Sequence, residues 1–519
     1  MAKTANNSAA GDTSAAKASS GQSSWLWFLT LLLAGAFVAS GLIGHQPWTK
    51  DEAYSLAAVN SILETGDYVE PQVDGQPALK SPPLYYITGA AIAHAAGRYV
   101  PADTLPPEQA ARIASGVFLA ITLFFTALFA RAAWRSGDDT PVPDVGSIAV
   151  LLLIGTLGIV WFGHDMIPDN ALMAGMAMAL YGLALLPRKV FWGGLWLGTG
   201  AGVAFMSTGL FGPVVLLVAA VLMPILLLFH KFGRYLKGFL LALLFALPWL
   251  IIWPWLLYQR DPHLYEVWLF TNNIDRFQDG FGLGTAQSQL EWLWVFLVMA
   301  FPAWLMAVLS LVLRPGALFG FSGVRAALVV ALVGWALVIT NQATSPIHGL
   351  ALLVPIAVIG AGGIQRLPRL FVWPAHWLSV LLFGVIAVAL WGAWVWLLYK
   401  GTPPPVEGLG TYLPMEYSFH WQPAVYITAA AVTVIWLWLV MRSRSSQPPA
   451  LLAWPVGVVM VWSLLALQQP WLEMAIEQGT LEKAVPAELM DLLPKAGPTS
   501  SSPASSSPAG TPAAPASTM

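Results

Sequence analysis

The sequence predicts an all-α polytopic membrane protein, and three observations support this class. First, 57% of the 519 residues are apolar and only 10% are charged, whereas soluble domains carry roughly 25% charged residues. Second, several apolar runs, among them Trp25–Ile43 and Trp421–Val440, reach the roughly 17 to 25 residues that a helix needs to cross a bilayer. Third, the basic residues gather in alternate loops between these runs.

The apolar runs divide into about thirteen predicted crossings. They span residues 25–44, 109–134, 146–163, 169–186, 190–208, 210–229, 237–258, 291–313, 325–341, 348–364, 373–399, 422–441 and 450–468. With the N-terminus in the cytoplasm, fifteen of the 24 Lys and Arg residues fall in the inner loops. The positive-inside rule therefore predicts this orientation, and an odd number of crossings places the C-terminus outside.

The ends of the chain differ in composition from the rest. Residues 1–24 and 498–519 are rich in Ala, Ser, Thr or Pro, which predicts disordered tails. Residues 469–497 are expected to form a short cap on the outer face. The segment 25–40, which ends in "FVAS", could instead be a cleaved signal peptide. The absence of cysteine excludes disulfides and thiolate metal sites.

The first outer loop, residues 45–108, is polar and begins with an adjacent pair of acids, Asp51 and Glu52. Apolar periodicity over 53–63 predicts a helix that lies along the membrane surface. The segment 84–97 is too short to span a bilayer comfortably and predicts a second interfacial helix. The loop therefore reads as an outer platform at the membrane boundary.

Three further outer loops carry polar side chains. The turn between the third and fourth crossings contains His164, Asp165 and Asp169, and the loop 259–290 contains a second group. That group is Arg260, Asn272, Asn273, Asp275 and Arg276, and a last turn adds Gln342 and His348. Ionisable groups at the membrane edge favour a functional site, although Asp169 could instead cap the helix that follows it.

Several motifs in this order resemble a known family. They are the Asp-Glu pair, the turn "GDYVEPQVDG", "PPLYY" and "RDP" followed by "NNIDRF". Together with "AARIASGVF", "GVAFMSTGLFGP" and "SPIHGLALLVP", they resemble bacterial membrane glycosyltransferases of the GT-C superfamily. The similar branch contains the aminoarabinose (lipid A) transferases and protein O-mannosyltransferase-like enzymes. The resemblance covers nearly the whole chain.

The resemblance implies a GT-C-like bundle over residues 25–468 in a bacterial inner membrane. It implies transfer of a sugar, with inversion, from a polyprenyl-phosphate donor at the periplasmic face. The acceptor would be a lipid, a glycan or a protein, and the partners would include membrane lipids but no nucleic acid. The alternative is a transporter or flippase of a polyprenyl-linked lipid, but no inverted repeat is seen and the predicted helix interiors are nearly free of charge.

Carrying the motifs over residue by residue assigns roles in this sequence. Asp51 becomes the catalytic carboxylate, which would deprotonate an acceptor hydroxyl or stabilise positive charge at the sugar. The alternative for Asp51 is a helix cap. The candidate substrate-binding residues are Glu52, Lys80, Tyr85, Asp169, Asn273, Arg276 and His348. For Lys80 and Arg276 the alternative is a solvated loop charge.

The resemblance also bears on metal dependence. Relatives carry a Glu and a His where this chain has Lys80 and Asn273, and both lost residues are the kind of ligand that a divalent metal needs. No cofactor is therefore expected, and a metal is not favoured. The alternative is a site rebuilt from Asp51, His164, Asp165 and Asp169, which would hold a hard cation through carboxylates.

Overall fold

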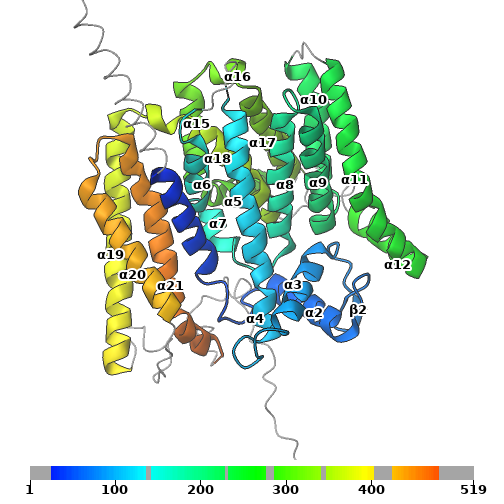
Figure 1. Ribbon diagram of the computed structural model, residues 1–519, viewed down its shortest axis with the longest axis horizontal. Coiled ribbons are helices and arrows are strands. Elements are labelled where there is room, and N and C mark those ends of the chain that lie inside the picture. Colours follow the sequence, from blue (N-terminus) through cyan, green and yellow to red (C-terminus); the bar gives the residue numbers. More distant parts are fainter. Residues whose placement is uncertain are drawn as a thin grey trace, which may run out of the picture.

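In the computed structural model the chain forms a helical bundle with a smaller layer of elements at one end (Figure 1). The structure describes residues 25–135, 142–227, 232–275, 286–340, 346–401 and 423–477. Both predicted tails lie outside these ranges. In the described part, one short antiparallel pair of strands, β1 (Gln72–Val73) and β2 (Gln76–Pro77), accompanies the helices.

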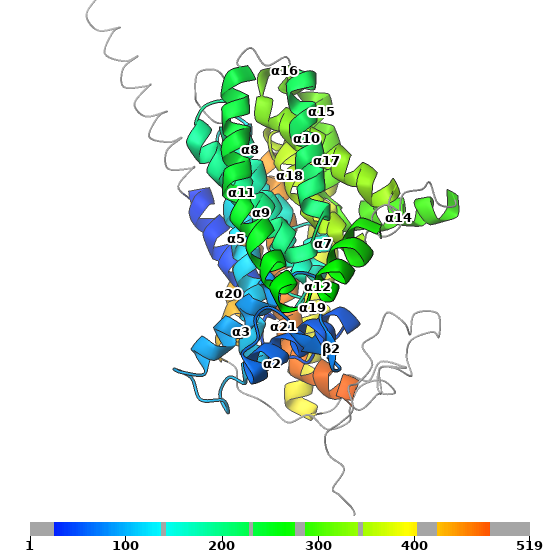
Figure 2. The same ribbon diagram turned by 90° about the vertical axis from the view of Figure 1, so that its right-hand side faces the viewer.

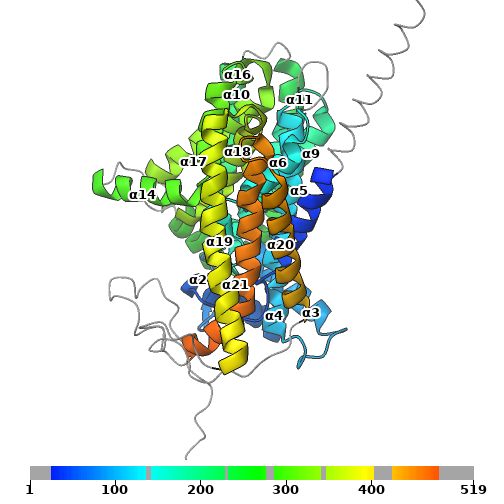
Figure 3. The ribbon, with the colours of Figure 1, turned by 90° about the vertical axis from the view of Figure 1, so that its left-hand side faces the viewer.

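Long apolar helices make up the bundle (Figures 1 and 3). In chain order they are the helix Trp25–Ala39, α5 (Ile113–Ala133), α6 (Val145–Ile154), α7 (Leu157–Phe162), α8 (Pro168–Leu185), α9 (Val190–Thr208), α10 (Phe211–Leu227), α11 (Phe232–Arg260), α14 (Ala286–Met299), α15 (Ala303–Leu313), α17 (Ser322–Thr340), α18 (Leu350–Ala361), α19 (Arg369–Lys400), α20 (Pro423–Arg442) and α21 (Ala453–Glu477). Short elements link them, namely α16 (Ala317–Gly320), η2 (Pro346–Gly349), η3 (Ile364–Arg366) and η5 (Pro448–Leu452).

Each of the thirteen predicted crossings contains at least one of these helices. Among the described residues, eight helices are long and apolar enough to cross a bilayer, or nine if one bent pair counts as a single crossing. The all-α polytopic class is therefore confirmed, while the number thirteen stays a prediction.

Two predicted crossings are broken helices. Residues 146–163 form α6 and α7, and residues 291–313 form α14 and α15, which are bent by 85°. The breaks meet, because the Leu157 amide at the start of α7 donates to the Phe301 carbonyl over 2.9 Å. Irregular backbone at membrane depth requires such a partner inside the protein.

Small residues let neighbouring helices approach closely. A Cβ atom added at Gly182 of α8 would overlap the backbone of Leu197 in α9. A Cβ atom added at Gly200 of α9 would in turn overlap Ala179 in α8. This packing of small residues is typical of helix contacts in membranes, and it makes α8 and α9 a rigid pair behind the outer layer.

The helices differ in how much protein surrounds them. In the apolar window of the α18 span 83% of the residues are buried, against 17% in α19 and 22% in α20. Helix α18 therefore lies at the centre of the bundle. Helices α19 and α20 form an edge that faces lipid, with α21 between them and the centre (Figure 1).

A layer of short helices lies across one end of the bundle (Figures 1 and 2). It consists of α2 (Lys50–Thr65), α3 (Leu84–Ala96), α4 (Pro107–Ala111) and the β1–β2 hairpin. Both helices predicted for the first outer loop are therefore present. The layer has its own apolar core, which Met166, just before α8, and Ala171, in the first turn of α8, complete. This contact fixes the layer against the bundle.

The loop 259–290 begins with α12 (Pro262–Glu266), whose N-cap is Asp261. It continues as the π-helical segment η1 (Val267–Asp275). At the other end of the chain, α21 continues past the predicted end of the last crossing to Glu477. Residues 478–497 of the predicted cap lie outside the described residues.

Candidate active site

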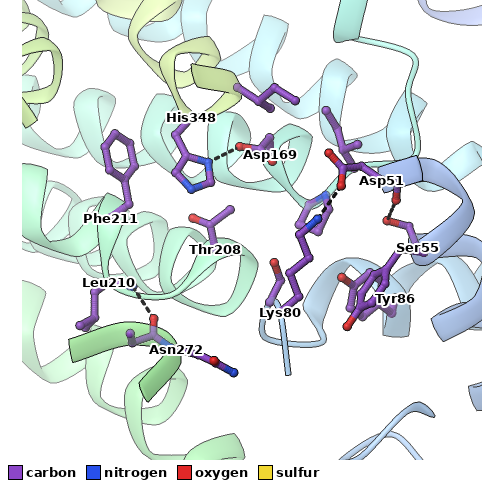
Figure 4. A pocket seen from close by; sticks show the side chains of 16 residues that line it. Asp51, Ser55, Lys80, Tyr86, Asp169, Thr208, Leu210, Phe211, Asn272 and His348 are labelled. Atoms are coloured by element: carbon purple, nitrogen blue, oxygen red, sulfur yellow. Dashed lines mark hydrogen bonds and ion pairs between the residues drawn. The ribbon is translucent and has the colours of Figure 1, made fainter. Parts of the chain in front are cut away.

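A cavity of about 130 Å³ lies where the outer layer meets the bundle (Figure 4). Its walls come from α2, the loop before α3, the start of α8, the turn after α9, η1 and η2. The polar side chains that line it include Asp51, Lys80, Asp169, Thr208, Asn272, Asn273 and His348. The structure thus brings together four polar loops that are far apart in the sequence.

Asp51 lies in the first turn of α2 with its side chain turned to the cavity. The helix is capped by Thr49, whose hydroxyl accepts a hydrogen bond from the Glu52 amide over 3.2 Å. Asp51 is therefore not the helix cap, and its carboxylate is free for another partner. That partner is Lys80, whose Nζ donates to Asp51 Oδ1 over 2.5 Å, and the Lys80 and Asp51 side chains are 52% and 45% exposed.

Two tyrosines line the cavity near this ion pair. Lys80 Nζ lies 5.5 Å from the centre of the Tyr54 ring, a distance at which a cation is attracted to the ring face. Tyr86 is almost fully buried beside it, and that burial raises the pKa of its phenol. Tyr86 therefore stays a neutral hydroxyl at the wall of the cavity.

A second polar pair faces the cavity from the bundle. Asp169 lies in the first turn of α8, where no side chain caps the helix, so the capping alternative does not apply to it either. Its carboxylate is 2.6 Å from His348 Nδ1 in η2. The His348 ring packs against Phe211, with ring centres 5.1 Å apart.

The third group consists of two asparagines of η1. Asn273 accepts a hydrogen bond from the Leu210 amide over 3.4 Å and donates to the Trp268 carbonyl over 2.8 Å. Asn272 donates to the Leu79 carbonyl over 3.3 Å. Both amides therefore tie η1 to neighbouring backbone, and π-helical segments of this kind occur often at functional sites.

Behind Asp51 lies a buried ionic network. Glu52 is 1% exposed and accepts hydrogen bonds from Arg112 over 2.9 Å and from the backbone amide of Met166 over 2.9 Å. Arg112 also donates to His45 Nε2 over 3.1 Å, so the other ring nitrogen carries the hydrogen and donates to the Gln46 carbonyl. Burial and the neighbouring guanidinium lower the pKa of His45 to about 4.

Comparison with known proteins identifies the class. No protein-family model matches the chain. The chain is 24% identical over 455 residues to the undecaprenyl phosphate-alpha-4-amino-4-deoxy-L-arabinose arabinosyl transferase 2 of Pseudomonas fluorescens, which covers 85% of this chain and 71% of that protein. It is 26% identical over 359 residues to the transferase of the same name, without the number, from Pseudomonas aeruginosa, and this match covers 66% of this chain and 60% of that protein.

Among solved structures, ArnT from Cupriavidus metallidurans bound to undecaprenyl phosphate superposes with a TM-score of 0.59. It shares 13% identity, and the match covers 89% of this chain and 80% of that one. The chain is a membrane glycosyltransferase of the GT-C fold. It is a multi-pass membrane protein, as the apolar helices require.

Not every residue that was predicted for the site of this glycosyltransferase lines the cavity. Glu52 and Tyr85 are buried and do not line it. Tyr85 instead shares a hydrogen bond of 2.5 Å with the Ser115 hydroxyl and packs against Phe118. The neighbouring Tyr86 takes the place at the cavity wall. Arg276 lies outside the described residues.

Sequence reasoning missed Tyr86 as a wall residue and Arg112 as the partner of Glu52. Successive residues of a helix point about 100° apart, so only one tyrosine of "PPLYY" can face the cavity. Both are apolar enough to be buried, and the sequence offers no sign of which one is. For Arg112 a signal exists, since a basic residue at the start of an apolar crossing needs an acidic partner.

The cavity of this glycosyltransferase does not offer a metal site in its described part. No group of three or more His, Asp or Glu side chains converges among the described residues. Asp51 faces the ammonium group of Lys80, which would repel a divalent ion. His164, a member of the rebuilt alternative, instead contacts the Phe37 carbonyl at 2.7 Å and stacks on Trp462.

Proposed function

We propose that this glycosyltransferase moves a sugar, with inversion, from a polyprenyl-phosphate donor to a lipid, glycan or protein acceptor. The names of the relatives support a polyprenyl-phosphate donor, because they are undecaprenyl-phosphate-dependent transferases. The reaction takes place at the periplasmic face of a bacterial inner membrane. In this proposal the N-terminus is cytoplasmic and the C-terminus periplasmic, as the distribution of basic residues indicates.

The observation that carries the proposal is the position of Asp51. Its carboxylate is not needed to cap α2, is about half exposed, and opens on a cavity at the end of the bundle. A lipid-anchored donor can reach such a place, because lipid and water meet there. Asp51 then accepts the proton of an acceptor hydroxyl as its oxygen attacks the anomeric carbon.

Lys80 provides the second part of the mechanism. Attack breaks the bond between the anomeric carbon and the phosphate oxygen, and negative charge develops on the leaving polyprenyl phosphate. The Lys80 ammonium group can exchange its carboxylate partner for this phosphate, which stabilises the charge and frees Asp51 to take the proton. Arg276 is proposed as a further phosphate contact.

Asp169 and His348 are proposed to bind the sugar. Their pair presents an oxygen acceptor and a ring nitrogen to the cavity, which suits sugar hydroxyls. Asn273 contributes mainly by holding η1 and the turn after α9 in place, since its side-chain oxygen and its side-chain nitrogen both form hydrogen bonds to the backbone.

The distribution of buried charge favours transfer over lipid transport. A flippase places ionisable groups near the bilayer midplane along its pathway. In the described part of the chain, the buried Glu52, Arg112 and Asp169 lie instead around the outer layer and the start of α8. They therefore support one site at one end.

The experiment starts from a deletion strain complemented with variants. Mass spectrometry of lipid A, surface polysaccharide and glycoproteins identifies the sugar that is missing from the deletion strain. Asp51→Asn should reduce its transfer by roughly 100-fold or more, because a general base is lost. The matched control is Asp74→Asn in the same outer loop, at an exposed turn with φ of 52° that Asn also tolerates. Transfer at the wild-type level by Asp51→Asn would remove this carboxylate from the mechanism.

A further inference from the structure

A second cavity, of about 430 Å³, lies between the bundle and its C-terminal helices. Its walls come from α6, α15, the first turns of α19, η5 and the start of α21, so it lies towards the end of the bundle away from α2 and α3 (Figures 1 and 3). Apolar side chains such as Leu151, Leu305, Leu378 and Trp454 cover most of its surface. Its volume falls in the range of roughly 300–1,000 Å³ that is usual for small-molecule sites.

Hydrogen bonds fix the walls of this cavity in position. Trp454 Nε1 donates to the Gly155 carbonyl over 2.8 Å, which fixes the start of α21 on α6. Trp436 Nε1 donates to the Ala453 carbonyl over 3.1 Å, and His376 Nδ1 lies 3.0 Å from the Ala450 carbonyl. Protein interiors are close-packed, so an apolar space that is framed in this way needs an apolar occupant.

A more polar cavity adjoins the apolar one. The two share Trp25, Pro449 and Leu452 in their linings, and the second is also lined by Arg442 and Arg444. Both guanidinium side chains are exposed, and neither forms an ion pair with another residue in the described ranges. The Arg442 guanidinium lies 5.9 Å from the centre of the Trp438 ring, and the Trp438 and Trp25 ring centres are 5.9 Å apart.

The charges of the joined cavities favour an anion. Asp144 is the one acidic side chain among the described residues that line them, and it belongs to the apolar cavity. The two arginines belong to the cavity at its side. Guanidinium groups bind phosphate through paired hydrogen bonds, and basic residues close to a membrane surface attract anionic lipids.

We propose that the two cavities together bind one anionic glycerophospholipid. An acyl chain occupies the apolar cavity, and the phosphate of the headgroup contacts Arg442 and Arg444. The lipid would hold the α19–α21 group against the bundle core, because the apolar cavity separates α19 and η5 from α6 and α15. The site is distinct from the one that contains Asp51, and it does not depend on the transfer reaction.

Native mass spectrometry of the purified full-length protein tests the proposal. The protein is titrated with phosphatidylglycerol or with phosphatidylcholine of the same acyl chains, and the bound copies are counted. We expect one tight copy of phosphatidylglycerol. Replacing both arginines, Arg442→Gln with Arg444→Gln, should weaken this binding about 30-fold, since each basic residue near a membrane contributes about fivefold.

Two further variants make the result specific. Arg234→Gln with Lys237→Gln removes two exposed charges from α11, which does not line either cavity, and should leave lipid binding unchanged. Ala375→Phe should fill the apolar cavity and remove the tight copy. The proposal is overturned if phosphatidylcholine binds equally well, if the α11 control weakens binding as much, or if a polyprenyl phosphate displaces phosphatidylglycerol at equal concentration.

Discussion

Two adjacent acids on α2 have different roles because a helix turns about 100° between them. Asp51 faces the cavity and Lys80, whereas Glu52 faces inward to Arg112 and the Met166 amide. The sequence predicts that the pair belongs to a functional site, but an isolated loop helix with little apolar contrast does not reveal which acid is buried. The Arg112 partner, sixty positions away in the chain, decides the question.

Glu52→Gln should therefore destabilise the protein more than Asp51→Asn does. Loss of the carboxylate leaves Arg112 buried without a charged partner, and such a loss costs about 3 to 5 kcal/mol. Asp51 is about half exposed, so the free energy of unfolding of Asp51→Asn should lie within about 0.5 kcal/mol of the wild-type value. Thermal unfolding of the purified variants in one detergent measures both.

A double variant separates the ionic pair from other effects of Glu52. Arg112→Met combined with Glu52→Gln removes both charges, so its loss of stability should be smaller than the sum of the two single losses. Additive losses would mean that the two charges do not stabilise each other in the folded protein.

The position of Lys80 beside Asp51 leads to a separate prediction, that sugar transfer does not require a metal ion. Since Lys80 takes the position of a cation beside Asp51, transfer should survive EDTA, and Lys80→Gln should lower transfer by roughly 100-fold or more. Lys50→Gln is the control, because Lys50 is an exposed lysine at the start of α2, next to Asp51, and does not line the cavity. Transfer that EDTA abolishes and added metal restores would contradict the metal-free mechanism.

At the scale of elements, the turn after α9 depends on one glycine. Gly209 has a φ of 77°, and a Cβ atom there would overlap Oδ1 of Asn273. The same oxygen accepts the Leu210 amide. The turn and η1 can therefore approach each other only if this position has no side chain, and the spacing of Thr208 and Asn272 across the cavity follows from that approach.

Gly209→Ala should displace η1 from the turn and lower both stability and transfer. A backbone in the left-handed region and a clash with Asn273 together should cost about 1 to 3 kcal/mol. The control is Gly392→Ala in α19, where no atom lies within 4 Å of the added Cβ and alanine favours the helix. Thermal unfolding and transfer assays of both variants test this, and equal behaviour would show that the turn tolerates a side chain.

The elements themselves were predictable wherever an apolar run is long and uninterrupted. Helices α19 and α20, whose surfaces mostly face lipid, follow the predicted crossings 373–399 and 422–441 closely. The breaks in 146–163 and 291–313 were not predicted, because a break that is satisfied inside the protein leaves the surrounding run just as apolar. Pairing between the two breaks requires contacts between residues far apart in the chain.

The whole molecule is polarised along the bundle axis. The outer layer, η1, η2 and the buried network of Glu52 surround one cavity at one end of the bundle. The cavity lined by Arg442 and Arg444 lies towards the other end. Helix α21 runs from that second region towards the end where α2 and α3 lie (Figures 1 and 3). The last described residues are therefore at the same end as the candidate active site, which agrees with an outer C-terminus.

This polarity predicts the result of a topology experiment in the membrane. An alkaline phosphatase, which is active only outside the cytoplasm, is fused in separate strains after Gly97, Gly137 and Gly497. The positive-inside rule places Arg131 and Arg135 in the cytoplasm, so the fusion after Gly137 should be inactive. The fusions after Gly97, in the loop of the outer layer, and after Gly497 should both be active, since α2, α3 and the end of α21 lie at one end of the bundle. An inactive Gly497 fusion beside an active Gly97 fusion would show an even number of crossings. Activity at Gly137 alone would reverse the orientation of the whole bundle, and with it the face on which the sugar is transferred.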